Sequence, residues 1–272
     1  MTEINKVAIL GGGNLGRAIA RGLVTSGAVS PGKVAITRRQ VELLDDLVDE
    51  GFLARSDNRG AAMGADVVIV SVQPQQMEDL LDVVAPVLDA GKQVVISTAT
   101  GVSIADIRRW VGPEIPVVRA MPNLGIAIGE SMTCLAVDDP TTDAAHVGKA
   151  LFDTMGSTLL IREDQMTSAT ALCACGIAFF LRAIRAASQG GIEIGFHAED
   201  ALQLASQTAK GAAALLLANR NHPEMEIDKV TTPQGCTISG LNEMENRGFS
   251  SAMVRGIIRS ADKAGALYRP GE

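Results

Sequence analysis

A glycine-rich turn between an apolar run and a helical run is the feature that most constrains this chain. The sequence reads Val7-Ala8-Ile9-Leu10, then Gly11-Gly12-Gly13-Asn14-Leu15-Gly16, and continues with helical periodicity over residues 17–23. A strand that turns on glycines directly into a helix directs free backbone N–H groups and the positive end of the helix dipole to one point. Because such a point suits a pyrophosphate, the pattern predicts a dinucleotide site.

Each glycine of the turn has a physical role in that prediction. Gly11 permits the tight turn, Gly13 lets a diphosphate approach the backbone, and Gly16 lets the helix pack close to the strand. A second strand expected at residues 33–37 supplies the context that the motif requires. The alternative is a glycine-rich turn with a structural role alone. The cofactor-binding residues predicted in this turn are Gly11, Gly13, Asn14, Leu15 and Gly16.

The end of the second strand indicates which dinucleotide is bound. NAD-binding proteins usually place Asp or Glu there to hold the ribose 2'-OH, whereas NADP-binding proteins place Arg there to pair with the 2'-phosphate. This chain reads Thr37-Arg38-Arg39, with no acid before Glu42. NADPH is therefore the predicted cofactor, with NADH as the alternative. The arginines could instead be a solvated helix start.

Composition agrees with a soluble intracellular enzyme. The chain has 272 residues, of which 47% are hydrophobic and 3% aromatic, so its cores are expected to be aliphatic. A net charge of -7 without a basic cluster argues against nucleic acid or an anionic membrane as a partner. No uninterrupted apolar run reaches the roughly 18 residues of a membrane span, and no secretory signal pattern opens the sequence. We expect a cytoplasmic protein.

The cysteines and histidines predict neither a disulfide framework nor a metal site. Three histidines lack the spacing of zinc ligands, and no metal is expected. Cys173-Ala174-Cys175 could be a redox pair or half of a metal site, but small thiols packed in an alanine-rich helix are the favoured interpretation. The four cysteines are dispersed: Cys134, Cys173, Cys175 and Cys236.

The first part of the chain alternates strands and helices, which is typical of a doubly wound α/β sheet. Further strands are expected at residues 66–72, 93–98, 116–120 and 131–135, with helices near residues 38–50, 75–89, 103–111 and 141–154. Ligands of such sheets bind beyond the carboxyl ends of the strands. Residues 72–75, 98–101 and 120–123 are therefore candidate pocket walls, and ordinary connecting turns are the alternative.

After Ile161 the chain is rich in Ala, Leu, Ile and Met without strand alternation. Helices are expected at residues 166–195, 198–219, 240–246 and 249–267. The predicted domains are a Rossmann-like dinucleotide domain over residues 1–162 and an all-helical domain over residues 163–272. The helices are apolar over broad faces, so we expect helices from two chains to pack together in a homodimer.

A segment between two of these helices, residues 228–240, has the features of a carboxylate site. Pro233 and Gly235 shape a turn, and the N–H groups that follow open the next helix. Thr237 is expected at that helix start, where its hydroxyl could face a ligand or only cap the helix.

Motifs along nearly the whole chain resemble the pyrroline-5-carboxylate reductase family. They are Gly11-x-Gly13-Asn14-x-Gly16-x-Ala18-Ile19, Val72-x-Pro74-Gln75, Gly101-Val102-Ser103-Ile104, Arg119-Ala120-Met121-Pro122-Asn123 and, most specific, Asp228-Lys229-Val230-Thr231-Thr232-Pro233. The resemblance implies a Rossmann domain followed by a helical dimerisation domain, with dimers often assembled into rings such as decamers. It also implies hydride transfer from NAD(P)H to the C=N carbon of L-1-pyrroline-5-carboxylate, which yields L-proline in the last step of proline biosynthesis.

The resemblance assigns roles to further residues. Thr237 would hydrogen-bond the ring nitrogen as it becomes an amine, and N–H groups of Gly235, Cys236 and Thr237 would hold the substrate carboxylate. The small residue Gly176 would border the substrate. Asn58 would lie near the adenosine, although it could equally be a plain helix cap. Val72, Pro74 and Thr100 would lie along the nicotinamide, and Asn123 is also assigned to the cofactor.

Several residues depart from the family pattern around the expected substrate pocket. The differing residues are Gln73 for Lys, Leu124 and Gly125 for Thr-Pro, Ile177 for Pro, and Gln234 for Gly. Two other functions therefore stay open. One is a β-hydroxyacid-type NADP-dependent dehydrogenase, which the absence of Lys between Met166 and Phe196 disfavours. The other is a non-catalytic NADPH-binding regulator.

Overall fold

A computed structural model describes residues 4–267, which fall into two compact units. The first comprises Met1–Cys175 with Ser260–Glu272, and the second comprises Gly176–Arg259. Within the described residues, the first unit contains one eight-stranded sheet. Its strands are β1 Val7–Leu10, β2 Val34–Thr37, β3 Leu53–Arg55, β4 Val67–Val70, β5 Val94–Ser97, β6 Val117–Met121, β7 Ser131–Ala136 and β8 Gly156–Leu160.

The strand order is β3-β2-β1-β4-β5-β6-β7-β8. Strands β3, β2, β1, β4, β5 and β6 run parallel to one another. Leu10 is in register with Thr37 on one side and with Val70 on the other. The carboxyl ends of β1, β2 and β4 therefore meet at one edge, where the strand order reverses. β7 runs antiparallel to β6, and β8 runs parallel to β7. The predicted doubly wound sheet is confirmed.

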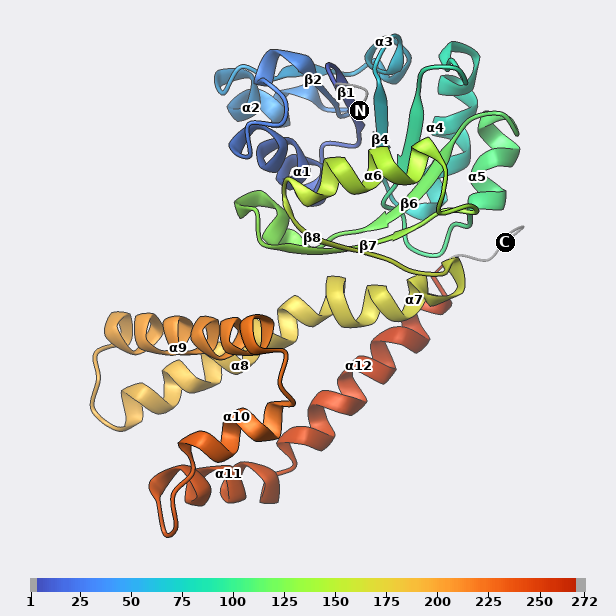
Figure 1. The fold of residues 1–272 in the computed structure, drawn as a ribbon. Helices are drawn as coiled ribbons and strands as arrows, with labels where there is room; N and C mark the ends of the chain where they lie inside the picture. The colour runs from blue at the N-terminus through green and yellow to red at the C-terminus, as the bar shows by residue number, and fades with distance from the viewer. Residues whose placement is uncertain (1–3, 268–272) are drawn as a thin grey trace. The chain divides into compact units, whose positions relative to one another are not determined.

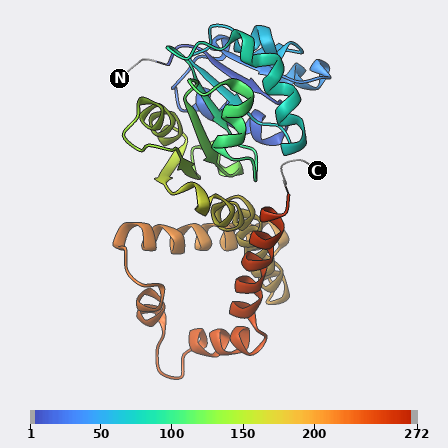
Figure 2. The same ribbon diagram turned by 90° about the vertical axis from the view of Figure 1, so that its right-hand side faces the viewer.

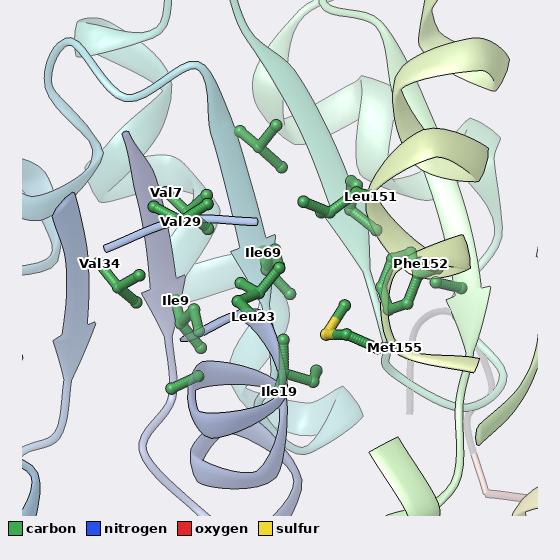
Figure 3. Close-up of a cluster of buried hydrophobic side chains, with 14 of the residues drawn as sticks. Val7, Ile9, Ile19, Leu23, Val29, Val34, Ile69, Leu151, Phe152 and Met155 are labelled. Carbon is green, nitrogen blue, oxygen red and sulfur yellow. The ribbon is translucent and has the colours of Figure 1, made fainter. Parts of the chain in front are cut away.

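Helices cover both faces of this sheet (Figure 1). Their bounds are α1 Asn14–Thr25, α2 Asp45–Asp49, α3 Asn58–Ala62, α4 Met77–Val84, α5 Ile104–Val111, α6 Asp143–Asp153 and α7 Met166–Ala169. Side chains of α1, α2 and α6 pack in one apolar cluster, which includes Ile19, Leu23 and Phe152 (Figure 3). Those of α3, α4 and α5 form a second cluster, which includes Leu81 and Ile107.

Two edge strands, β3 and β8, were not expected from the sequence. All of their residues are exposed or half-buried, so neither has the buried apolar run that marks β1, β4 and β5. The helix expected at residues 38–50 is a 3₁₀ turn at Val41–Leu44 followed by the short α2. The helix expected at residues 75–89 is α4 between two 3₁₀ turns, each containing a proline.

The second unit is entirely helical in the residues described. It contains α8 Gly176–Glu193, α9 Ala198–Asn219, α10 Pro223–Val230, α11 Cys236–Asn246 and most of α12 Phe249–Gly265. α8 and α9 lie side by side (Figures 1 and 2). The prediction of α9 is confirmed. α10 was not expected from the sequence, and Pro223 occupies its first turn, where proline is favoured.

The segment expected as one helix over residues 166–195 is interrupted. α7 passes into a π-helix at Thr170–Cys175 before α8 begins. A π-helix adds a residue to a turn and often occurs at functional sites. The apolar periodicity of residues 166–195 did not predict this π-helix.

The helical unit leaves most of its large apolar side chains exposed. Ala201 is the only hydrophobic residue in Gly176–Arg259, all of which the structure describes, that is buried. Leu217 is 81% exposed, Ile194 78% and Phe180 61%. A domain cannot be stabilised by so little buried apolar area, so this surface is suited to being covered by another chain.

The continuous helical stretch Glu163–Glu193 is long and apolar enough to cross a bilayer, judged by length and composition alone. The stretch is not an uninterrupted apolar run, since Arg182 and Arg185 lie within it, but its mean hydropathy reaches 1.6. A single such helix is weak evidence for a membrane span, since helices of soluble proteins can have the same composition.

Candidate active site

A cleft of about 810 Å³ lies at the carboxyl edge of β1, β2 and β4. The residues that follow these three strands line it, including Gly11 to Gly13, Thr37 to Arg39, and Ser71 to Gln73. Side chains of α4 complete the wall. This is the crevice at which doubly wound sheets bind dinucleotides, because loops on either side of it diverge from the switch in strand order.

The glycines of the turn meet three different constraints. Gly11 has a φ of +116°, and an added Cβ would lie 2.2 Å from the Ser71 carbonyl oxygen. At Gly16 an added Cβ would lie 2.0 Å from the Gly11 carbonyl oxygen, so only glycine lets α1 approach the turn. Gly13, by contrast, has no protein atom within 4 Å of that position, although it lines the cleft.

The open space at Gly13 fits a phosphate group. Gly13 is the N-cap of α1 and makes no side-chain cap, and the first turn of α1 contains no acidic residue. The N–H groups of that turn therefore point outward without a carboxylate beside them. The residues present fit the pyrophosphate of a dinucleotide.

Thr37 organises one wall of the cleft. Its hydroxyl donates a hydrogen bond to Asn58 Oδ1 at 2.5 Å and accepts one from the Gly11 N–H at 3.3 Å. Thr37 is 2% exposed. Asn58 lines the cleft, and the N-cap of α3 is Asp57, whose side chain accepts the Arg59 N–H. The helix-cap alternative for Asn58 is therefore wrong, because its neighbour performs that role.

The two arginines after β2 lie on the same wall. Arg38 is half-buried and donates from Nη1 to the Gly12 carbonyl oxygen at 3.0 Å, which fixes the guanidinium beside the glycine turn. Arg39 is exposed. Within residues 4–267, neither pairs with a carboxylate. Their remaining N–H groups are thus free to bind an anion.

Some of the other residues predicted to bind the cofactor do not line this cleft. Val72 does, but Pro74, Thr100 and Asn123 do not, nor do Asn14, Leu15 and Gly16. Asn14 is exposed in the first turn of α1, whereas Gly16 is buried beneath the turn. Of the three strand ends predicted as pocket walls, the one after β4 borders the cleft, and those after β5 and β6 do not.

Several residues that line the cleft were not anticipated. Most lie in the connections that follow β2, β3 and β4 or in α4, and no local motif marks them, although their places after strand ends could have indicated some of them. They are Gly12, Gln40, Ser56, Ser71, Gln76, Asp79, Leu80 and Val83.

The predicted carboxylate-binding residues lie in the second unit. Gly235 is the N-cap of α11, with Cys236 and Thr237 in the first turn, and that turn has no acidic residue. An added Cβ at Gly235 would lie 2.4 Å from Thr232 Oγ1, so the turn requires glycine. The α11 cap makes no side-chain hydrogen bond, so the prediction of Thr237 as a cap is wrong, and its half-buried hydroxyl is free for a ligand.

The residues that depart from the family pattern occupy different environments. Gln234 has a φ of 59°, in the left-handed region that favours glycine. Gly125 N–H bonds to Asn123 Oδ1 at 2.9 Å, and Leu124 is 54% exposed. Gly176 is buried at the start of α8, followed by the half-buried Ile177.

The cysteines are free, and no group of metal-ligating side chains occurs in the part of the chain that the structure describes. Cys173 contacts Cys134 of β7, with 3.9 Å between the sulfur atoms. The disfavoured alternative, a pair of Cys173 with Cys175, is therefore not the contact that the fold forms.

Comparisons with known proteins agree with this arrangement. A family model described as pyrroline-5-carboxylate reductase dimerisation matches residues 163–267, and one described as NADP oxidoreductase coenzyme F420-dependent matches residues 6–101. Pyrroline-5-carboxylate reductase 1 of Dictyostelium discoideum is 51% identical over 97% of this chain, and the chain spans about half of that relative's length (50%). Pyrroline-5-carboxylate reductase 2 of the same organism is 47% identical over 95% of this chain and 91% of its own length.

The fold is also that of a solved structure, Plasmodium falciparum pyrroline carboxylate reductase with NADP bound. Its TM-score is 0.88 at 22% identity, covering 98% of this chain and 99% of that one. The sheet, the glycine turn and the cleft define a dinucleotide-binding oxidoreductase with a helical second part. The chain belongs to the pyrroline-5-carboxylate reductase family, an NADP-dependent oxidoreductase family that carries a dimerisation domain.

Proposed function

We propose that this chain reduces L-1-pyrroline-5-carboxylate to L-proline with NADPH, the last step of proline biosynthesis, with NADH as a weaker alternative. The observation that carries the cofactor half is the open position at Gly13, where the fold leaves room in front of the free N–H groups of α1. The substrate half rests on membership of the family, whose relatives bear that activity in their names.

The chain's own residues account for cofactor binding in this proposal. The first turn of α1 holds the pyrophosphate, Asn58 binds near the adenosine, and Arg38 and Arg39 pair with the 2'-phosphate. Val72, which lines the cleft, and Pro74 and Thr100, which lie outside it, are assigned to the nicotinamide side, and Asn123, also outside it, is assigned to the cofactor. The bound cofactor supplies a hydride to the C=N carbon.

In the proposed reaction the protein needs to position the substrate more than it needs a strong acid catalyst. A cyclic imine is readily protonated near neutral pH, and the resulting iminium carbon is already electrophilic. N–H groups of Gly235, Cys236 and Thr237, at the start of α11, hold the substrate carboxylate. The Thr237 hydroxyl hydrogen-bonds the ring nitrogen as it becomes an amine, and Gly176 leaves room for the ring.

The assembly that we propose is a homodimer formed through a helical domain over residues 163–272, beside a cofactor domain over residues 1–162. The exposed apolar side chains of α8 and α9 support it, because a second copy would remove them from water. Such dimers could assemble further into rings such as decamers. Four free cysteines support a cytoplasmic location, and we propose neither nucleic acid nor a membrane as a partner.

The reductase activity is tested by mixing purified protein with NADPH and pyrroline-5-carboxylate and measuring the loss of NADPH absorbance. A β-hydroxyacid reaction is run in parallel. Thr237→Ala should lower turnover roughly 10-fold or more, since it removes a hydrogen bond to a developing amine. Thr237→Ser should restore most of it, and Ser251→Ala, which removes an exposed hydroxyl from the same unit, should change nothing. Tight NADPH binding without imine-dependent turnover would identify a regulator instead.

A further inference from the structure

Cys134 and Cys173 form a close thiol pair that the reductase chemistry does not use. Cys134 lies in β7, Cys173 lies in the π-helix that precedes α8, and their sulfur atoms are 3.9 Å apart. Cys134 is buried, at 4% exposure, whereas Cys173 is partly exposed. Cys173 is therefore the more accessible residue of the pair.

The surroundings of the pair favour reaction within the pair over reaction with other groups. Met121, Ala136, Met166 and Ala169 enclose the two thiols in a small apolar cluster. Asn123 Nδ2 also donates to the Cys173 carbonyl oxygen at 3.4 Å, which ties the π-helix to the chain that follows β6. The thiols are thus held facing each other from two different elements.

The two thiols differ in acidity. A hydrogen bond from Cys134 lowers the pKa of Cys173 to about 7, against the opposing effect of its partial burial. The hydrogen bond to Cys173, burial and the charge on Cys173 raise the pKa of Cys134. Near neutral pH a substantial fraction of Cys173 is therefore thiolate, which is the reactive form, while Cys134 retains its proton.

We propose that Cys134 and Cys173 are a reversible redox pair, in which a peroxide oxidises Cys173 and Cys134 then closes a disulfide between β7 and the π-helix.

Each step balances. The Cys173 thiolate attacks one peroxide oxygen, so that an S–O bond forms, the O–O bond breaks and hydroxide leaves as water after taking a proton. Cys173 is then a sulfenic acid. The Cys134 sulfur attacks the Cys173 sulfur, its proton leaves with the sulfenic hydroxyl as a second water, and the S–S bond replaces the S–O bond. Two thiols are oxidised and one peroxide is reduced.

Closure requires only a local movement. A disulfide has an S–S distance of about 2.05 Å, so the sulfur atoms must approach by about 2 Å. Once Cys173 is a neutral sulfenic acid, the charge that helps to keep Cys134 protonated is gone, which favours the second step.

A disulfide between Cys134 and Cys173 would also restrain the backbone next to residues of the proposed site. Gly176 follows the π-helix directly along the chain, and Asn123 bonds to the Cys173 carbonyl. This consequence rests on the proposed function, whereas formation of the disulfide does not.

The test treats the fully reduced full-length protein with hydrogen peroxide, then counts free thiols and maps linked peptides by mass spectrometry. We expect two of the four thiols to disappear, a linkage between the peptides that contain Cys134 and Cys173, and full reversal by dithiothreitol. Cys175→Ser, two residues from Cys173, should behave as wild type. Cys134→Ser should stop at a sulfenic acid on Cys173 that dimedone traps.

A second measurement does not depend on oxidation. The rate of Cys173 alkylation should rise through a midpoint near pH 7 in wild type, and Cys134→Ala should move that midpoint upward because the hydrogen bond is lost. Four free thiols after peroxide treatment, or a linkage through Cys175 or Cys236 in place of Cys134, would overturn the proposal. Loss of the linkage in Cys134→Ser with an unchanged circular dichroism spectrum excludes misfolding as the cause.

Discussion

Thr37 holds Asn58 in place through a hydrogen bond from its hydroxyl to Asn58 Oδ1, while the same hydroxyl accepts the Gly11 N–H. One buried side chain therefore joins the end of β2, the glycine turn after β1 and the first turn of α3. With Oδ1 occupied by Thr37, the Asn58 amide nitrogen is left to donate to a ligand. The wall of the cleft is set before any cofactor arrives.

Thr37→Val tests this arrangement while keeping the shape of the side chain. It leaves the Gly11 N–H and the Asn58 amide without their partner, which costs about 1–3 kcal/mol. We expect NADPH affinity to fall by roughly 10-fold, measured by fluorescence titration. Thr133→Val removes another buried hydroxyl, bonded to Ser131 Oγ outside the cleft, and should leave that affinity unchanged. Equal losses in both variants would contradict a specific role for Thr37.

Gly13 and Gly16 should respond in opposite ways to alanine. Gly13→Ala places a methyl group in the open space of the cleft, so it should weaken NADPH binding and leave the melting temperature nearly unchanged. Gly16→Ala forces a methyl group against the Gly11 carbonyl oxygen, so it should destabilise the fold by about 1–3 kcal/mol. Calorimetry and NADPH titration on both variants separate the effects, and a large stability loss in Gly13→Ala would show that the space is not free.

Replacing Arg38 and Arg39 together by Ala should change the choice of cofactor. Charge-assisted hydrogen bonds contribute about 1.5–3 kcal/mol each, so the KM for NADPH should rise roughly 10- to 100-fold, while that for NADH changes little. Steady-state kinetics with both cofactors provides the measurement. The control removes Lys33 and Arg162, two positive charges of the same unit outside the cleft. Equal changes for the two cofactors would exclude pairing with the 2'-phosphate.

Gln234→Gly should stabilise the turn before α11. Gln234 has a φ of 59°, a conformation that costs a non-glycine residue about 1 kcal/mol, so removing its Cβ should raise the free energy of unfolding by up to about that amount. Chemical denaturation at fixed protein concentration measures it. Gln207→Gly, within α9, should instead lower stability because glycine disfavours helix. A loss of stability in Gln234→Gly would show that the side chain makes a compensating contact in the assembled protein.

Local patterns were sufficient for much of the fold. The apolar runs at β1, β4 and β5 and the glycine turn identified a dinucleotide fold, because burial on both faces and a tight turn each leave a signature within a few residues. The helix expected near residues 103–111 is α5, which begins after a capping box at Ser103. Edge strands such as β3 and β8 left no such signature, since none of their residues is buried.

The sequence by itself determined the class of fold, the glycine cradle and the family, because these depend on residues that are neighbours along the chain. Only the tertiary structure decided that Thr37 bonds to Asn58, that Asp57 caps α3 and that Cys134, not Cys175, faces Cys173. Those contacts join elements far apart in the sequence, and strand order and helix packing bring them together, so no local periodicity encodes them.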